Sequence, residues 1–158
     1  MSQTRPITMT INGETVSQQV SVRTNLVDFL RNDVGLTGSH VGCEHGVCGA
    51  CTIEVDGAAV RGCLMLAVQA DGSSITTIEG LTDKPTGQKL QKAFQKHNAL
   101  QCGYCTPGML ASAMEYVEDG KAADRAAIRE HISGNYCRCT GYQSIVDAIA
   151  EVVEETSS

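Results

Sequence analysis

The sequence of 158 residues contains no tryptophan, and only 4% of its residues are aromatic, so we expect an aliphatic core. It has no apolar run near the roughly 18 residues that a membrane-spanning helix needs, and we therefore expect no membrane span. The net charge of −6 argues against a nucleic-acid partner. The first residues lack the apolar stretch of a secretory signal. We therefore expect a cytoplasmic protein, although export as a folded complex with a signal-bearing partner is compatible with this pattern.

Two residue types are abundant instead, with eight cysteines and sixteen glycines. Thiols stay reduced in the cytosol, so the cysteines are interpreted as metal ligands before disulfides. A content of 42% hydrophobic and 19% charged residues is typical of a soluble globular protein. The length suits one average domain or two small ones.

The first half of the chain is predicted to be β structure with one helix. Asn12-Gly13 and Asp56-Gly57 are typical hairpin turns between short strands. Asn25 can cap a short helix. The expected strands are residues 7–11, 14–20, 51–55, 58–61 and 74–78, with a glycine-rich loop over 35–49. This strand–strand–helix–strand order resembles a β-grasp.

The second half changes to a helical pattern. Thr106 is a predicted N-cap followed by Pro107 at the first helical position, and Thr140 can cap the last helix. The expected helices are residues 87–97, 106–118, 122–132 and a segment after 140. We therefore expect an α+β protein with an N-terminal domain over residues 1–80 and a C-terminal domain of four helices over residues 81–158.

The cysteines split into two sets of four, one in each half. The first set has the spacing C-x4-C-x2-C, and a fourth cysteine follows after eleven intervening residues: Cys43, Cys48, Cys51 and Cys63. This is the plant-type ferredoxin spacing for a [2Fe–2S] cluster. Three glycines interleave with these cysteines, and glycine allows a loop to wrap tightly so that backbone N–H groups point at the cluster sulfides.

The second set has the spacing C-x2-C and, later, C-x-C: Cys102, Cys105, Cys137 and Cys139. Each pair immediately precedes a predicted helix cap, at Thr106 and at Thr140. The free N–H groups and positive dipole end of a helix favour thiolate charge at that position. Two antiparallel helix pairs that bring these ends together would form one four-sulfur site.

Other interpretations of the cysteines are weaker. Four cysteines also suit a structural zinc, but the plant-type triplet of the first set argues against zinc for the two sites together. Disulfides conflict with the expected compartment. Eight unliganded cysteines would make the spacings a coincidence. His45 lies inside the first loop, yet four cysteines already fill that site.

Three segments together resemble a known family. They are GCEHGVCGACT at residues 42–52, QCGYCTPG at residues 101–108 and NYCRCTGY at residues 135–142. In this order they are similar to the iron–sulfur small subunit of the molybdenum hydroxylases, the xanthine oxidase family. The resemblance extends over residues 7–153 and shows no departure at the eight cysteines.

The resemblance implies two [2Fe–2S] clusters, a plant-ferredoxin-like β-grasp domain and a C-terminal four-helix bundle. It also implies partners: a large molybdopterin (Mo) subunit beside the helical-domain cluster and a medium FAD subunit nearer the ferredoxin-type cluster, in a heterotrimer or its dimer. Gln101 and the region of Cys139 would contact the pterin across the subunit interface. A polar residue that braces its own loop is the alternative role for Gln101.

The sequence contains no nucleophile dyad, no G-x-G-x-x-G and no P-loop, so we expect no catalytic residue in this chain. We interpret it as an electron-transfer subunit that is part of an enzyme only within its complex. Two alternatives are a free-standing two-cluster ferredoxin, which would purify as a monomer, and a two-zinc scaffold, which would be colourless. The sequence does not name the substrate, because substrate contacts would lie in another chain.

Overall fold

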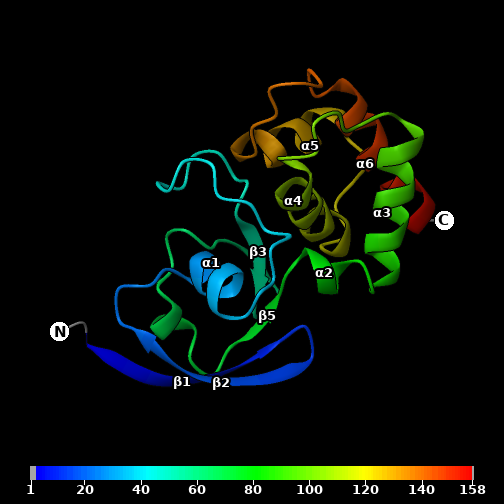
Figure 1. Cartoon of the computed structure of the whole chain (residues 1–158). Helices are drawn as coiled ribbons and strands as arrows, with labels where there is room; N and C mark the ends of the chain where they lie inside the picture. The colour runs from blue at the N-terminus through cyan, green and yellow to red at the C-terminus, as the bar shows by residue number, and fades with distance from the viewer. Residues whose placement is uncertain (1–2, 158) are drawn as a thin grey trace.

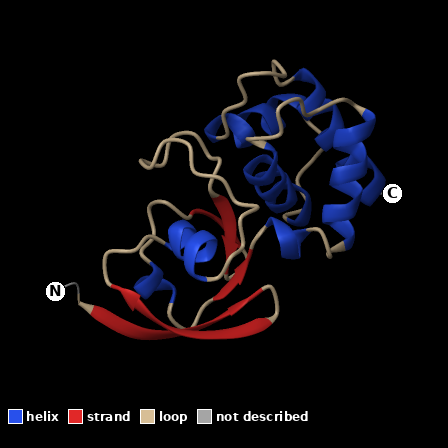
Figure 2. Cartoon of the chain, viewed as in Figure 1, coloured by secondary structure: helices blue, strands red, loops and turns tan. Residues whose placement is uncertain are grey.

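A computed structural model describes residues 3–157. The chain forms a β-sheet half and a helical half, joined near residue 77 and packed side by side (Figure 1). The strands lie in one half and the longer helices in the other (Figure 2). Each half has its own cluster of buried hydrophobic side chains. The loops that carry the cysteines lie where the two halves approach each other.

The sheet has five strands in the order β2-β1-β5-β3-β4. Strands β1 and β5 run parallel, and the other neighbours are antiparallel. The strands are β1 (Thr4–Ile11), β2 (Glu14–Ser21), β3 (Thr52–Val55), β4 (Ala58–Arg61) and β5 (Ser74–Thr76). Both predicted hairpins are confirmed. The last strand is shorter than predicted, because Ile78 already begins helix α2 (Ile78–Leu81).

One short helical segment covers the sheet. Asn25 caps α1 (Leu26–Asp28) by accepting a hydrogen bond from the Asp28 N–H, as predicted. The chain continues into a π-helical turn, η1 (Phe29–Asp33). Leu26, Phe29 and Leu30 are fully buried here and pack against the sheet, so this segment closes the first core.

The second half consists mainly of helices around an aliphatic core. Its elements are α3 (Pro85–Lys96), α4 (Thr106–Glu118), α5 (Arg125–His131), the 3₁₀ turn η3 (Ile132–Gly134) and α6 (Gln143–Ser157). Helix α4 is buried on nearly every side and packs against α2, α3, α5, α6 and strand β3. On α6, Ile145, Ile149 and Val152 are buried on one face, as their spacing predicted.

The predicted caps at the cysteine pairs need correction. Cys105, not Thr106, occupies the N-cap position of α4. Helix α6 begins at Gln143, so Thr140 does not cap it. The reason is local: Gly141 and Tyr142 have φ values of 68° and 69°, in the left-handed region that an α-helix cannot contain. The last cysteine pair therefore lies in a loop before α6 and not directly at its N-terminus.

Candidate metal centres

The first four cysteines converge through the β3–β4 hairpin and the loop before it. Cys43 and Cys48 lie in that loop, Cys51 directly precedes β3, and Cys63 follows β4. Antiparallel pairing of Thr52 with Arg61 places Cys51 and Cys63 on neighbouring strand ends. The Gly62 N–H donates to the Cys51 carbonyl at 3.1 Å and holds this arrangement. The hairpin thus brings together cysteines that are far apart in the sequence.

Within this set the sulfurs form two pairs, with Cys43 close to Cys48 and Cys51 close to Cys63. The Cys48 N–H donates to the Cys43 sulfur at 3.4 Å. Hydrogen bonds from the backbone of Cys48 and then of His45 lower the pKa of Cys43 to about 6. Burial raises the pKa of Cys51 to about 11. The lowered pKa favours the thiolate form of Cys43, whereas Cys51 would give up its proton only on binding a metal.

The loop around this set is wound tightly. Glu44, Gly46 and Gly49 all have positive φ, between 58° and 83°. Such turns direct successive N–H groups toward one point, as an anionic group requires. A Cβ on Gly42 would lie 3.0 Å from the Cys48 sulfur. Gly42 therefore lets the backbone lie close to the Cys48 sulfur, whereas a Cβ on Gly46 or Gly49 would meet Leu64 or Gly134 instead.

The second four cysteines also form two pairs. The sulfurs of Cys102 and Cys139 are 3.6 Å apart. Cys105 and Cys137 interact through their side chains. The Thr140 hydroxyl donates to the Cys137 sulfur at 3.1 Å. The loop before α4 and the loop before α6 therefore meet at one end of the helical half.

The pKa values in this set also differ between partners. Burial raises the pKa of Cys105 to about 12, and the neighbouring Cys137 adds to the shift. Burial also opposes ionisation of Cys137, but hydrogen bonds from the side chain and backbone of Thr140 outweigh it and lower its pKa. Thr140 thus stabilises the thiolate form of Cys137, a role different from the predicted helix cap.

The pairing of the sulfurs bears on which metal group fits. A zinc site needs four sulfurs about 2.3 Å from one ion. No set of three or more His, Cys, Asp or Glu side chains within residues 3–157 has the geometry for a single metal ion. A [2Fe–2S] cluster instead takes two ligands on each of two irons. Both sets, each arranged as two pairs, fit such a cluster.

Gln101 lies beside the second set. Its Nε2 donates to the Cys139 carbonyl at 3.1 Å, and its side chain is exposed. The structure therefore brings Gln101 and Cys139 together, and the amide braces its own cysteine loop. One more donor hydrogen and the amide oxygen remain available to an outside group by geometry.

The loops that carry the two sets contact each other where the halves meet. The Tyr136 N–H donates to the Cys48 carbonyl at 2.8 Å. His40 stacks on Tyr104, with ring centroids 4.6 Å apart. Buried Asn135 links both halves by hydrogen bonds. Sequence reasoning missed the role of Asn135, because only the tertiary fold brings this residue to the contact.

Comparisons with known proteins match both halves. Residues 9–76 match the family described as "2Fe-2S iron-sulfur cluster binding domain", and residues 77–150 match "[2Fe-2S] binding domain". The chain is 52% identical over 155 residues to the caffeine dehydrogenase subunit gamma of Pseudomonas sp. (strain CBB1), covering 95% of this chain and 92% of the relative. It is 53% identical over 145 residues to the nicotine 6-hydroxylase small subunit of Paenarthrobacter nicotinovorans, covering 92% and 87%.

The solved structures agree. A chain of quinoline 2-oxidoreductase from Pseudomonas putida 86 matches with a TM-score of 0.92 at 52% identity, over 99% of this chain and 97% of that chain. The chain belongs to the iron–sulfur small-subunit family of the molybdenum hydroxylases. It carries two 2Fe-2S binding domains and is a subunit of an oxidoreductase. This role implies electron transfer.

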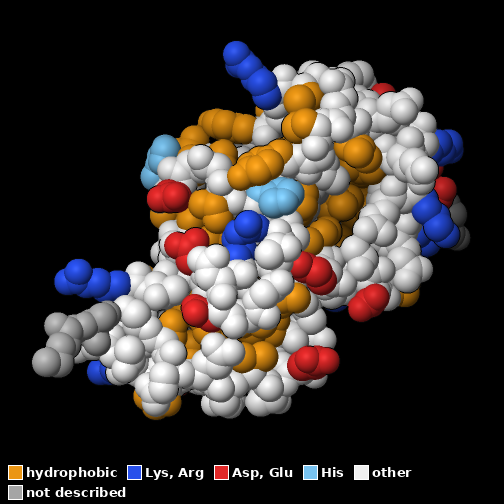
Figure 3. Space-filling view, viewed as in Figure 1, with side chains coloured by type: hydrophobic (Ala, Val, Ile, Leu, Met, Phe, Trp, Pro, Cys, Tyr) orange, Lys and Arg blue, Asp and Glu red, His pale blue; other side chains and the backbone are white. Residues whose placement is uncertain are grey.

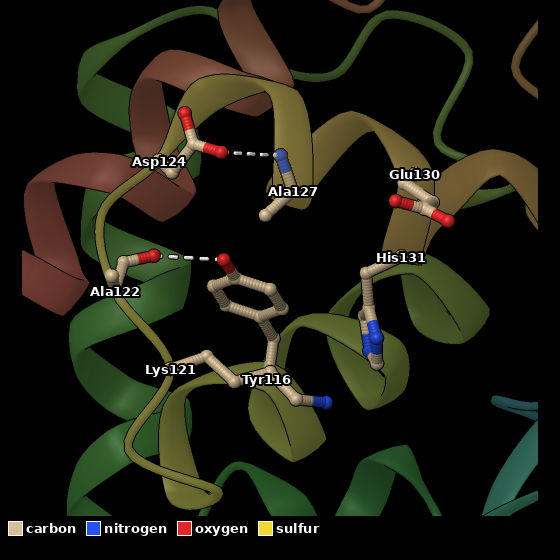
Figure 4. Close-up of a pocket in the computed structure, with 7 residues that line it drawn as sticks. All are labelled: Tyr116, Lys121, Ala122, Asp124, Ala127, Glu130 and His131. Atoms are coloured by element: carbon tan, nitrogen blue, oxygen red, sulfur yellow. Dashed lines mark hydrogen bonds between the residues drawn. The ribbon is translucent and has the colours of Figure 1, made fainter.

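A surface pocket of about 590 Å³ lies beside α5 in this iron–sulfur subunit. Tyr116 points into it, and its hydroxyl donates to the Ala122 carbonyl at 2.7 Å (Figure 4). Asp124 accepts from the Ala127 N–H at 3.1 Å at the start of α5. His131 packs edge-on against Tyr116 and bonds the Ser112 carbonyl. These groups brace the α4–α5 connection.

No helix within residues 3–157 is long and apolar enough to cross a bilayer. Several large hydrophobic side chains are nevertheless exposed near the cysteine loops: Val47, Leu64, Leu66, Leu100, Tyr104 and Tyr136. The space-filling view shows hydrophobic side chains gathered over the helical half on the visible face (Figure 3).

Proposed function

We propose that this subunit relays electrons from a molybdopterin (Mo) subunit to an FAD subunit through two [2Fe–2S] clusters. The carrying observation is that the eight cysteines form two sets, each made of two sulfur pairs, and that a hydrogen bond joins the loops that carry these sets. The proposed ligands are Cys43, Cys48, Cys51 and Cys63 for one cluster and Cys102, Cys105, Cys137 and Cys139 for the other.

We further propose a division into a ferredoxin-type domain, residues 1–80, and a helical domain, residues 81–158, whose helices form a four-helix bundle. Two separate buried cores support it. The packing of α3, α4, α5 and α6 around the second core supports the bundle. The family matches meet between residues 76 and 77, within a few residues of the proposed boundary.

We infer the order of electron transfer from the exposure of the second cysteine set. Cys102 and Cys139 are exposed, as is Gln101 beside them. A pterin on the partner could therefore approach this set directly, with Gln101 and Cys139 as its contacts. We place the molybdenum subunit there and the FAD subunit beside the first set, where Val47 is 44% and Leu64 63% exposed. Exposed side chains of this size suit a permanent interface in a heterotrimer or its dimer.

A free-standing ferredoxin is the alternative, and a purification distinguishes the two. We expect the tagged chain to co-purify with a larger molybdenum-containing chain and an FAD-containing chain, each near one per copy. A stable, soluble monomer without these partners would contradict the subunit role. We propose a cytoplasmic location, because that compartment keeps eight thiols reduced for cluster assembly.

A further inference from the structure

One hydrogen bond connects the two proposed clusters more directly than any other contact described between residues 3 and 157. The Tyr136 N–H donates to the Cys48 carbonyl at 2.8 Å. Cys48 is a proposed ligand of the first cluster, and Tyr136 is bonded to Cys137, a proposed ligand of the second. The path from sulfur to sulfur runs along the Cys48 side chain and carbonyl, across this bond, and through Tyr136 to the Cys137 side chain.

A second contact between the cysteine loops is less direct. His40 Nδ1 donates to the Tyr104 carbonyl at 2.8 Å, and the Tyr104 hydroxyl donates to the Val41 carbonyl at 2.7 Å. Tyr104 adjoins Cys105, but Val41 is separated from Cys43 by a residue. This contact fastens the loops, whereas the bond at Cys48 starts from a ligand itself.

Asn135, the residue before Tyr136, is 2% exposed and its hydrogen-bonding capacity is filled. Its Nδ2 donates to the Gly49 carbonyl at 3.1 Å and to the Gly108 carbonyl at 3.0 Å. Its Oδ1 accepts from the Ser112 hydroxyl at 2.9 Å and from Arg61 at 3.3 Å. The Asn135 side chain therefore connects the first cysteine loop, strand β4 and helix α4 directly before Tyr136, the donor of the hydrogen bond to Cys48.

Two further features hold Asn135 in place. Arg61 donates to the Gly134 carbonyl at 2.9 Å and also to the Thr52 hydroxyl. A Cβ on Gly49 would lie 2.5 Å from the Gly134 carbonyl oxygen, so only glycine permits this approach. The backbone before Tyr136 is thus fixed from the ferredoxin side of the interface.

We propose that Asn135 is a positioning residue that holds the Cys48–Tyr136 hydrogen bond and thereby sets the electronic coupling between the two clusters. This inference rests on the proposed function, because it requires both clusters. Asn135 has no role as a ligand here, since its amide is spent on other partners and its side chain is turned into the interface. Asn135 affects the coupling between the clusters only by holding the Cys48–Tyr136 hydrogen bond in place.

The test compares Asn135→Asp and Arg61→Met with Tyr116→Phe in the full, cluster-loaded chain. Asn135→Asp keeps the size and the acceptors but removes both donors. Arg61→Met keeps an apolar stem and leaves Asn135 in place, so it remains informative if the first variant fails to fold. Tyr116→Phe removes one hydrogen bond inside the helical half and is the control.

Two measurements report on the Cys48–Tyr136 hydrogen bond without using enzyme activity. The first is electron paramagnetic resonance of the fully reduced chain, in which two nearby paramagnetic clusters split each other's signals. The second is hydrogen–deuterium exchange of the peptide that carries the Tyr136 N–H. For Asn135→Asp we expect a smaller splitting, because its through-bond exchange part falls, with both g-tensors retained. We also expect exchange at least about tenfold faster, which corresponds to 1.4 kcal/mol of easier local opening.

Arg61→Met should shift both readouts in the same direction, and Tyr116→Phe should shift neither. Unchanged splitting and exchange in a folded Asn135→Asp or Arg61→Met chain would overturn the inference. A wild-type chain with both clusters but no splitting would also overturn it. A wild-type chain without two clusters would instead contradict the proposed function, and iron analysis before the comparison separates these failures.

Discussion

Replacing Gly108 by alanine tests how closely the two halves are packed. Gly108 lies in the first turn of α4, where an added Cβ would come within 2.2 Å of the Gly49 carbonyl oxygen and 3.1 Å of the Ala50 one. Both neighbours are backbone, so α4 or the cysteine loop has to move by roughly 1 Å to reach ordinary contact. Overpacking of this kind costs about 1–3 kcal/mol. Because the blocking atoms are backbone, the upper part of this range applies, about 2–3 kcal/mol. Alanine recovers at most about 1 kcal/mol of helix propensity, leaving a loss of about 1–2 kcal/mol.

Urea denaturation of the cluster-loaded chain under anaerobic conditions measures this loss. With a slope of about 2 kcal/mol per molar urea, the midpoint should fall by about 0.5–1 M. Gly87→Ala is a matched control, because Gly87 has the same position in α3 and its Cβ would meet the Leu81 carbonyl at 2.0 Å within the helical half. Gly108→Ala should also speed exchange at Tyr136, whereas Gly87→Ala should not. A midpoint that stays or rises for Gly108→Ala would refute the close packing.

Four further results are expected. Cys43→Ser should remove one cluster signal and leave the other, because the two sets belong to separate halves, each with its own core; loss of both in a folded chain would contradict this independence. The two clusters should have different midpoint potentials, because Cys105 of the second set stands at the N-terminus of α4, next to its positive dipole end, while the first set lies in a loop of N–H groups; a titration with one potential would count against it. Gln101→Ala should weaken molybdenum retention or slow reduction of the helical-domain cluster, and unchanged kinetics with full molybdenum would limit Gln101 to bracing Cys139. Burial opposes ionisation of Glu79, but hydrogen bonds and Arg31 hold its pKa below the usual value. The stability that ionised Glu79 contributes should therefore be lost as the pH falls through this lowered pKa. Glu79→Gln should make the urea midpoint less dependent on pH in this acid range.

Local signals predicted much of the fold. The Asn12-Gly13 and Asp56-Gly57 turns, the Asn25 cap and the apolar face of α6 depend on short stretches of sequence, and the structure agrees with each. The predicted start of α6 was wrong, because no sequence pattern indicates a left-handed backbone at a non-glycine residue such as Tyr142. The spacing of hydrophobic residues likewise could not predict that the turn after α1 is π-helical.

The grouping of the cysteines followed from their spacing, but the contact between the groups did not. Asn135 is the first residue of the NYCRCTGY segment, in which the cysteines draw the attention. An asparagine in a loop is ordinarily interpreted as a turn residue. Its partners Gly49 and Gly108 are 86 and 27 residues away. Only the packed halves show that its amide spans them. Interdomain hydrogen bonds of this kind depend on tertiary geometry, which no local pattern encodes.

Iron and acid-labile sulfide content tests the central claim most directly. The chain, purified anaerobically with its partners and separated from them, should contain about four iron atoms and about four sulfides, two of each for every [2Fe–2S] cluster. The same sample should be coloured and become paramagnetic on reduction. Two zinc ions per chain, no labile sulfide and no visible absorption would contradict the account.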